Sequence, residues 1–518
     1  MTSFNKNKFI SFMVIGSFVL KMSGFIKQFI IANQFGTSYI TDSYFFALTV
    51  PFILSGVIGN PLKSTIIPIL SSMYNDESEV NVNRVINNII NVVTIILGIF
   101  FILAILNTPK VVSILAPGLN NEAYYLLIEL VRIYLPGMLT VGFINTLIGY
   151  LNFNGDFKTD NIALLVNNII VITTLILFNG VNGIRVAIIA EVIGSIIQLI
   201  IIIYKSSIYG YKFKFVIDLK EKFLKELLII SAPVIISTFL SEINVYMDIS
   251  FSTLLSEGSL SYLNYANRIR SIPVVILFAS IVQVLFISIS NTIGKKDRNL
   301  VITEIKQGFI LVFMIGIICS SYFVVYAEKI VSILYLRGKF SIEDVNLTTD
   351  IVQMYSIGLI FVILRSYLVK IFYAFKNTKV VTVISTVSLL INFILNNILI
   401  KLMGVAGLAL ATTISEGVNI FILYILLSKK LKKILGMEDI MKLVLFTIIS
   451  VSSIWGINII YYSIINNINN YSIEFILLII SVSISAILIL ILSYIFKIEE
   501  LKKIIDKYLK KVRQQLSD

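Results

Sequence analysis

The chain has 518 residues, of which 57% are hydrophobic and 14% charged, and its formal net charge is +13. Because ordinary soluble domains contain about 25% charged residues, this composition excludes a soluble protein and indicates a polytopic membrane protein. A single cysteine excludes an intramolecular disulfide, and the absence of histidine excludes imidazole metal sites and histidine proton relays. We expect no cofactor and no metal. We also expect no nucleic-acid partner, since the excess Lys and Arg are spread over short loops.

Apolar stretches long enough to cross a bilayer follow one another along the whole chain. The first begins with basic residues but lacks a small-residue cleavage site, so we expect it to be retained as a span. Fourteen transmembrane helices are predicted, over residues 8–34, 41–72, 84–107, 122–151, 160–179, 183–204, 224–250, 260–292, 301–325, 344–375, 379–401, 404–428, 440–464 and 472–496. The fold class is therefore an all-α polytopic membrane protein, with kinks where prolines interrupt the longer spans.

The charges of the loops predict the orientation. If the N-terminus is cytoplasmic, the basic segments at 205–225, 294–299 and 428–433 and the tail from 497 onward all lie inside. Only six of the 42 Lys and Arg residues then lie outside, namely Lys110, Arg185, Lys329, Arg337, Lys339 and Lys401. We expect both termini on the cytoplasmic side of a bacterial inner membrane.

A faint internal repeat divides the chain. "FIIANQFG" ends at Gly36, fifteen residues before Pro51, and "FSTLLSEG" ends at Gly258, fifteen residues before Pro273. Parallel repeats of this kind build many transporters, with the substrate site between the halves. We expect five parts: an N-lobe of six helices over 1–205, a basic cytoplasmic linker over 206–223, a C-lobe of six helices over 224–428, two further helices over 429–496, and a basic cytoplasmic tail over 497–518.

Eight cations lie within or at the edges of the predicted spans, where a charge costs roughly 2.5–3.5 kcal/mol on insertion scales. They are Lys21, Lys27, Lys63, Arg132, Arg268, Arg270, Arg365 and Lys370. The acids in comparable positions are Asp42, Glu129, Glu191, Glu242, Asp248 and Glu416. Because the cations outnumber the acids, we expect some of them to face a wet cavity or an anionic ligand.

Lys21 and Lys27 are the innermost of these cations. On a helix they are about 9 Å apart along the axis and about 120° apart around it, so they could line one broad cavity at two depths. The structural alternative is an ion pair with Asp42, Glu242 or Asp248.

The other cations have structural alternatives as well. Arg268 and Arg270 are about 200° apart on a helix, so only one can face a given pocket, and we favour Arg268. Snorkelling to the membrane surface would account for Lys63, Arg365 and Lys370. An ion pair with Glu129, three residues earlier on the helix, would account for Arg132.

Five segments in register resemble the MviN/MurJ-like lipid II flippases of the multidrug/oligosaccharidyl-lipid/polysaccharide exporter superfamily. They are "SGFIKQFIIANQFGTSYITDSYFFALTVP" at 23–51, "LAPGL" at 115–119, "SYLNYANRIRSIP" at 261–273, "LYLRGKFSIEDV" at 334–345 and "FYAFKNTKVV" at 372–381. The resemblance implies two six-helix lobes around a positive central cavity, with the last two helices (429–496) forming a groove for a lipid tail. It also implies alternating access that carries an undecaprenyl-diphosphate-linked glycan to the outer leaflet.

The resemblance also implies the residues of the headgroup site. Lys21 and Lys27 match cavity arginines of the family, Asp42 matches its aspartate in the second span, and Arg268 matches its arginine in the eighth. We expect the three cations to bind the diphosphate and Asp42 to move or release one of them. Second-rank candidates are Lys63, Asp248, Arg270 and Arg365.

This sequence departs from the family at three places, and the departures leave the glycan open. The span-1 arginines are lysines, which lose bidentate pairing, Ser55 and Gly56 replace a basic residue, and Ser271 replaces an acid. Alternatives are a flippase for capsule or O-antigen repeat units, a cation-coupled multidrug exporter, and a non-transporting scaffold or glycosyltransferase. Without an ATP-binding motif, the energy source is expected to be the membrane potential or a monovalent cation. Cell-wall synthesis proteins are expected as partners.

Overall fold

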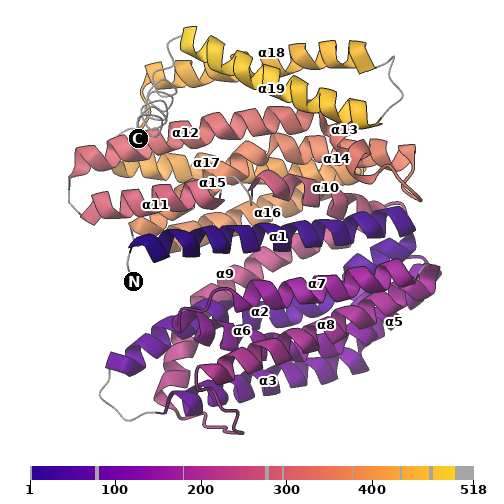
Figure 1. Ribbon diagram of the computed structural model, residues 1–518, viewed down its shortest axis with the longest axis vertical. Coiled ribbons are helices and arrows are strands. Elements are labelled where there is room, and N and C mark those ends of the chain that lie inside the picture. The colour runs from indigo at the N-terminus through magenta and orange to yellow at the C-terminus, as the bar shows by residue number, and fades with distance from the viewer. Residues whose placement is uncertain are drawn as a thin grey trace. The chain divides into compact units, whose positions relative to one another are not determined.

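In the computed structural model, the described residues are 3–75, 81–178, 180–274, 279–294, 297–375, 377–431, 434–465 and 471–495. Their regular structure is entirely helical, which confirms the predicted fold class (Figure 1). The chain divides into two compact units. The first contains the described residues up to Asn264 together with Arg337–Asp344, and the second contains the rest.

The first unit is built from the following helices: α1 (Ser3–Phe35), α2 (Tyr39–Asn75), α3 (Val82–Leu106), α4 (Thr108–Leu115), α5 (Asn121–Tyr134), η1 (Leu135–Gly137), α6 (Met138–Phe153), α7 (Thr159–Leu177), α8 (Gly180–Ile208) and α9 (Lys222–Ser252). It also holds the start of α10 (Ser259–Pro273). Helix α2 is its centre, because α5, α6 and α9 all pack against it. Gly149 of α6 allows one of these close approaches, since a Cβ there would lie 3.0 Å from the Ile66 side chain.

The second unit contains the rest of α10, α14 (Ile342–Ile357) from Val345 onward, and the following helices: α11 (Ala279–Gly294), α12 (Arg298–Val325), α13 (Ala327–Tyr335), α15 (Leu359–Ala374), α16 (Thr378–Met403), α17 (Val405–Leu431), α18 (Met437–Ile465) and α19 (Tyr471–Ile495). Its core is formed by α12, α15 and α17, and α18 packs on α12. The packing places α9 with the first unit, whereas the sequence led us to expect it in the C-lobe. The predicted lobe boundaries stay a prediction.

Helix α2 is sharply bent, as its prolines predict. Its two segments, Tyr39–Ile53 and Ser55–Met73, meet at 56°. Pro51 lacks the N–H that would complete the helical ladder, and its ring clashes with the preceding turn. The Ser55 hydroxyl donates a 2.8 Å hydrogen bond to the Pro51 carbonyl at the bend. The proline therefore accounts for the kink.

Eleven of the described helices are long and apolar enough to cross a membrane, and the bent α2 makes twelve. These twelve correspond to twelve of the predicted spans. The other two predicted spans are 8–34, which is α1, and 260–292, which contains α10, the short apolar helix α11 and the residues 275–278 that are not described. The protein is thus a multi-pass membrane protein, and the count of fourteen stays a prediction. The predicted tail, 497–518, lies outside the described residues.

Candidate functional site

Helix α1 carries the two innermost cations and is held along one side by α7. The Asn168 side-chain amide donates to the Ser23 hydroxyl at 2.9 Å, and the Gln34 amide donates to the Leu175 carbonyl. These polar contacts fix the rotation of α1 about its axis. The rotation in turn decides which way each lysine points.

Lys27 forms an ion pair in the interior of the first unit. Its Nζ lies 2.7 Å from Oε1 of Glu191 on α8, and the two side chains are 17% and 8% exposed. The Tyr44 hydroxyl of α2 donates to the same carboxylate oxygen at 2.9 Å. A buried carboxylate needs such partners, because desolvating an unpaired charge is very costly. The positive charge of Lys27 is therefore compensated.

Lys21 is in a different position. Its side chain is exposed, and within the described ranges of the chain the structure shows no ion pair or hydrogen bond to it. Lys21 lies near the middle of α1 along its length, so it is too far from the helix ends to be an ordinary loop lysine. An ammonium without an ion pair at the middle of a predicted span is the kind of group that binds an anion.

Asp42 is buried at the start of α2 and accepts three hydrogen bonds from the start of α10. Oδ2 accepts from the Gly258 N–H at 2.8 Å, and Oδ1 accepts from the N–H and hydroxyl of Ser261 at 2.8 and 2.5 Å. In return, Glu257 accepts from the Tyr39 N–H, the first of α2, at 2.8 Å. Asp42 of α2 thus caps the N-terminus of α10, and Glu257, just before α10, caps the N-terminus of α2. Both contacts satisfy backbone amides that a helix leaves unpaired at its N-terminus.

The glycines that end the two repeated segments lie beside this pair of caps. Gly36 and Gly258 both have left-handed backbones, with φ of 62° and 86°. A Cβ on Gly258 would lie 2.7 Å from the Thr37 carbonyl oxygen, and one on Gly36 would lie 2.7 Å from the Lys339 carbonyl oxygen. Only glycine combines this conformation with so close an approach. The short repeat seen in the sequence therefore has the same structural role twice.

The segment Arg337–Asp344 completes this polar cluster within the first unit. Asp344 Oδ1 accepts from the hydroxyls of Thr37 and, at 2.8 Å, Tyr262. Its Oδ2 accepts from the Ser341 N–H at 2.7 Å, and the Lys339 N–H donates to the Asn33 carbonyl at 3.0 Å. The ends of α1 and α10 and this segment are therefore tied together by two buried carboxylates, Asp42 and Asp344.

The remaining cations are mostly partnered. Lys63 pairs with Asp160, Arg270 lies 4.4 Å from the centre of the Tyr355 ring, and Lys370 lies 5.1 Å from that of Phe286. Arg132 is exposed, and Glu129, its expected partner, binds Arg185 at 2.7 Å instead.

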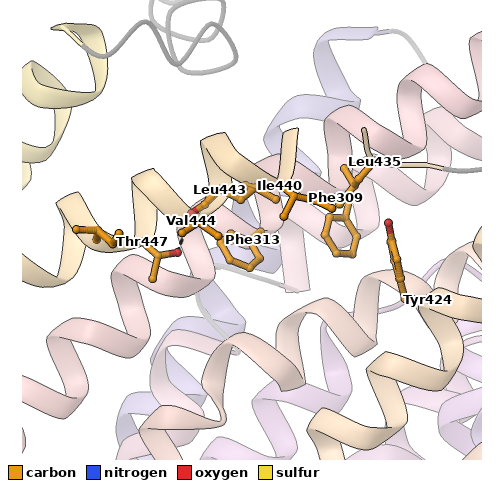
Figure 2. Close-up of a pocket in the computed structure, with 9 residues that line it drawn as sticks. Phe309, Phe313, Tyr424, Leu435, Ile440, Leu443, Val444 and Thr447 are labelled. Carbon is orange, nitrogen blue, oxygen red and sulfur yellow. Dashed lines mark hydrogen bonds between the residues drawn. The ribbon is translucent and has the colours of Figure 1, made fainter. Parts of the chain in front are cut away.

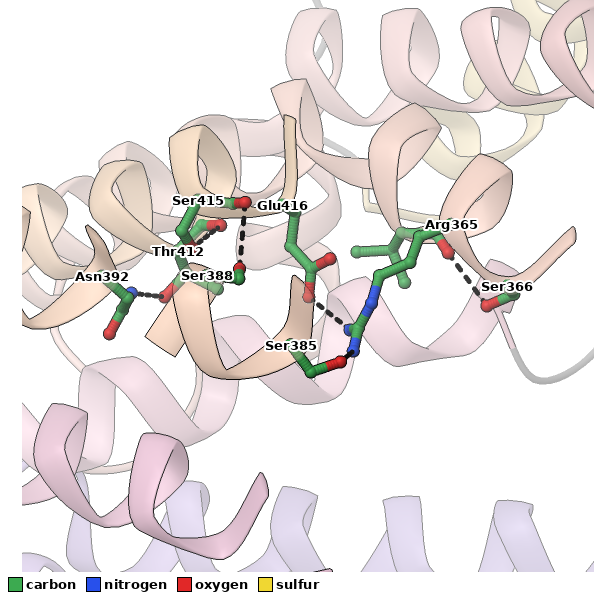
Figure 3. A network of polar contacts seen from close by, with 9 residues as sticks. Arg365, Ser366, Ser385, Ser388, Asn392, Thr412, Ser415 and Glu416 are labelled. Atoms are coloured by element: carbon green, nitrogen blue, oxygen red, sulfur yellow. Dashed lines mark hydrogen bonds and ion pairs between the residues drawn. The ribbon is translucent and has the colours of Figure 1, made fainter. Parts of the chain in front are cut away.

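Arg365 belongs to a polar network inside the second unit (Figure 3). Its guanidinium lies 2.8 Å from Glu416 of α17 and donates to Ser385 of α16 at 3.4 Å. The network continues between α16 and α17, where Ser388 donates to the Ser415 carbonyl and Asn392 donates to the Thr412 hydroxyl. Arg365 is therefore compensated, as Lys27 is.

Arg268 and Asp248 are half-buried, in the second and first unit respectively. The described part of the chain offers Arg268 no ion pair. Of the first-rank cations, Lys21 and Arg268 are thus the two without an ion pair among the described residues. Among the described residues, no three Asp, Glu, Cys or His side chains gather in a way that could hold a metal.

Sequence reasoning missed two groups, the partner of Lys27 and the reciprocal caps. Glu191 is visible as an acid within an apolar stretch, but nothing local connects it with a lysine 164 positions earlier. Glu257 lies next to the repeated Gly258, just before α10, so its position in the sequence could have indicated a helix-capping residue. The partner that it caps is visible only in the fold.

The family model "Lipid II flippase MurJ" matches residues 31–504 of this chain. The chain belongs to this family. The sequence resemblance is thereby confirmed over nearly the whole length, including α1 from Ile31, α2 and both halves of the internal repeat.

Individual relatives and a solved structure of this family are also similar to the chain. The chain is 26% identical over 472 residues to a "Probable lipid II flippase MurJ" of Buchnera aphidicola from Acyrthosiphon pisum, covering 85% of this chain and 89% of the relative. It is 21% identical over 440 residues to the "Lipid II flippase MurJ" of Burkholderia cenocepacia, covering 82% and 84%. A solved "Lipid II flippase MurJ, inward closed conformation" superposes with a TM-score of 0.78 at 25% identity, over 94% and 98% of the two chains. A multidrug transporter of the MATE family, at 14% identity, shares the fold (TM-score 0.67; 80% and 94% covered).

The Lys27–Glu191 pair predicts a specific stability pattern. Lys27→Ala should lower the free energy of unfolding by about 3–5 kcal/mol, because it leaves the Glu191 carboxylate buried without its cation. The double variant Lys27→Met/Glu191→Gln should recover much of this loss. Thermal unfolding of the purified protein measures both, and Lys21→Ala, on the same helix, is the matched control that should change little. Equal losses for Lys21→Ala and Lys27→Ala would contradict the assignment.

The Asp42 contacts predict a second pattern. Asp42→Asn should lower the free energy of unfolding by about 1–3 kcal/mol, because charge-assisted hydrogen bonds to three donors become weaker or are lost. Ser261→Ala removes only the hydroxyl donor and should cost less. Hydrogen exchange at the first turn of α10 should rise in Asp42→Asn. Unchanged exchange at these amides would show that Asp42 does not cap them.

Proposed function

We propose that this protein is a lipid II flippase, a transporter that moves the undecaprenyl-diphosphate-linked peptidoglycan precursor from the inner to the outer leaflet by alternating access. The observation that carries the proposal is the family match over residues 31–504. The uncompensated Lys21 in the middle of α1 supports it, because a diphosphate headgroup needs cations along its path.

The headgroup presents the main physical obstacle, since a diphosphate cannot enter hydrocarbon without compensating charge. Lys21 is proposed to supply this charge in the first unit and Arg268 in the second. The Lys27 ammonium donates one hydrogen bond to Glu191 and has two further N–H donors for a phosphate oxygen. Asp248 and the paired cations Lys63, Arg270 and Arg365 stay second-rank candidates.

Asp42 is proposed to act in the conformational switch. Its carboxylate holds the first turn of α10, and α10 continues along the chain into the second unit. Breaking these hydrogen bonds would free both the carboxylate and the helix end. The same step would expose a buried acid, and a newly exposed negative charge fits the release of a bound anion.

The lipid tail is proposed to lie along the last two helices. An apolar pocket of about 370 Å³ lies between α12, α17 and α18 (Figure 2). It is lined by Phe309, Phe313, Tyr424, Leu435, Ile440, Leu443, Val444, Thr447 and Ile448. Such a surface suits an isoprenoid chain, which has no polar group to satisfy. We extend the proposed tail groove of 429–496 to include this face of α12.

The cellular setting follows from the proposed substrate and the loop charges. We propose the bacterial cytoplasmic membrane, with both termini on the cytoplasmic side. The membrane potential or a monovalent cation is the proposed energy source, and cell-wall synthesis proteins are the proposed partners.

Complementation tests the proposed function. In a strain depleted of its lipid II flippase, the wild-type gene should restore growth and Lys21→Ala should not, because the substitution removes an uncompensated cation from the headgroup path. Lys21→Arg should retain growth, since it keeps the charge. The matched control is Lys110→Ala, which removes an exposed lysine at the start of α4 and should complement fully.

Protein levels in the membrane must be equal for all variants. Full growth with Lys21→Ala at the wild-type protein level would contradict the role of Lys21. Failure of the wild-type gene itself would contradict the proposed substrate.

A further inference from the structure

The segment that joins α8 to α9 is not a loose linker, because asparagines on α3 bind its backbone. The Asn83 amide donates to the Gly210 carbonyl at 2.9 Å and the Asn87 amide to the Lys212 carbonyl at 2.8 Å. The Asn91 amide donates to the carbonyls of Lys214 and Val216 at 3.2 and 3.0 Å. We call residues 209–219 the strap.

Further contacts fasten both ends of the strap. The Asp218 backbone N–H donates to the Asn88 side-chain oxygen Oδ1, and the Asn88 side-chain Nδ2 donates to the Asp218 backbone carbonyl, both at 2.8 Å. Tyr211 is buried and its hydroxyl donates to Asn87 at 2.8 Å. At the other end, the Tyr150 hydroxyl donates to the Tyr209 carbonyl at 2.6 Å. The strap is therefore fixed to α3 and α6 of the first unit.

The order of these hydrogen bonds gives the path of the strap along α3. Asn83 and Asn91 are eight residues apart, which is about 12 Å along the helix axis. The strap starts beside Asn83, reaches Asn91 at Lys214–Val216 and returns to Asn88 at Asp218. Its tip therefore points along α3 towards the middle of this candidate membrane-spanning helix. Ile95, the next residue on that side of α3, is exposed and apolar, as expected at a lipid-facing surface.

The tip of the strap exposes large apolar side chains next to lysines. Phe215 is 74% exposed and Phe213 54% exposed, and Lys212 and Lys214 are also exposed. The Phe213 ring lies 5.8 Å from that of Phe143 on α6, whereas Phe215 is the more exposed of the two. Aromatic side chains are typical of the membrane interface, and lysines beside them are attracted to anionic headgroups.

We propose that the strap is a membrane anchor that inserts its tip into the interfacial region of one leaflet and binds anionic phospholipid headgroups. Phe215 and Phe213 enter the acyl boundary, and Lys212 and Lys214 extend to the headgroups. The occupant is a lipid surface and not a soluble protein, because the strap joins two membrane-spanning helices and its tip lies one helical turn from the lipid-facing Ile95. The asparagines transmit this anchoring to α3, so the strap sets the depth of the first unit.

Tryptophan fluorescence of the full-length protein in vesicles tests the proposal. The chain has one tryptophan, Trp455, so Trp455→Phe provides a dark background. Phe215→Trp reports on the tip of the strap, and Tyr209→Trp reports on the end beside Asn83. The vesicles are phosphatidylcholine, or phosphatidylcholine mixed with phosphatidylglycerol, each with and without bromine on the acyl chains.

The anchor predicts that the tip reporter is quenched by brominated lipid more strongly than the Tyr209→Trp reporter, and is shielded from aqueous acrylamide. Phosphatidylglycerol should increase the lipid quenching at the tip, and Lys212→Gln/Lys214→Gln should abolish that increase. Asn91→Ala removes both hydrogen bonds at the tip and should reduce the lipid quenching towards that of the Tyr209→Trp reporter. Thermal unfolding confirms that each variant is folded.

Two results would overturn the proposal. A tip reporter that is open to acrylamide and insensitive to brominated lipid would place the strap in water, where its apolar side chains would suit a soluble partner. An unchanged response to phosphatidylglycerol in Lys212→Gln/Lys214→Gln would remove the lysines from the interaction.

Discussion

Charge compensation inside a membrane is the constraint on which the arrangement of the first unit depends. A lysine placed at the middle of a span must meet a carboxylate, water or an anionic ligand. Lys27 meets Glu191, which Tyr44 also holds, and this contact joins α1, α2 and α8. Lys21, six residues earlier on the same helix, has no such partner in the described structure. One helix therefore carries both a cation with a carboxylate partner and, among the described residues, a cation without one.

The same constraint applies to carboxylates and helix ends. Asp42 and Glu257 each cap the helix that begins beside the other, so neither a buried acid nor a buried N-terminus is left unsatisfied. This arrangement repeats around Gly36 and Gly258, whose left-handed backbones let the two segments approach closely. The two copies of the internal repeat thus meet in one contact, in which each carboxylate caps the helix beside the other. We call this contact the reciprocal joint. A joint made of a few hydrogen bonds can open at modest cost, unlike a packed apolar core.

Much of the architecture could be predicted from the sequence, because span length and apolar composition are local properties. The all-helical fold, twelve of the spans and the bend of α2 follow from apolar runs and from Pro51. Lys21 stood out as a cation within a predicted span, Asp42 was assigned a role through the family resemblance, and the roles of both at the site stay predictions. The partner of Lys27 could not be predicted, since Glu191 is distant in sequence and three other acids were equally plausible. The asparagines at 83, 87, 88 and 91 have helical spacing, but only the fold shows that they bind the strap.

The central claim is that Lys21 supplies an uncompensated charge to a diphosphate. Binding of undecaprenyl diphosphate to the purified, reconstituted protein tests it most directly. Lys21→Gln should weaken binding by roughly 10- to 100-fold, the equivalent of one charge-assisted contact of about 1.5–3 kcal/mol, and the remaining binding should depend less on salt. The control Lys27→Gln/Glu191→Gln, which removes a compensated pair, should change affinity less. Wild-type affinity and salt dependence in Lys21→Gln would contradict the account.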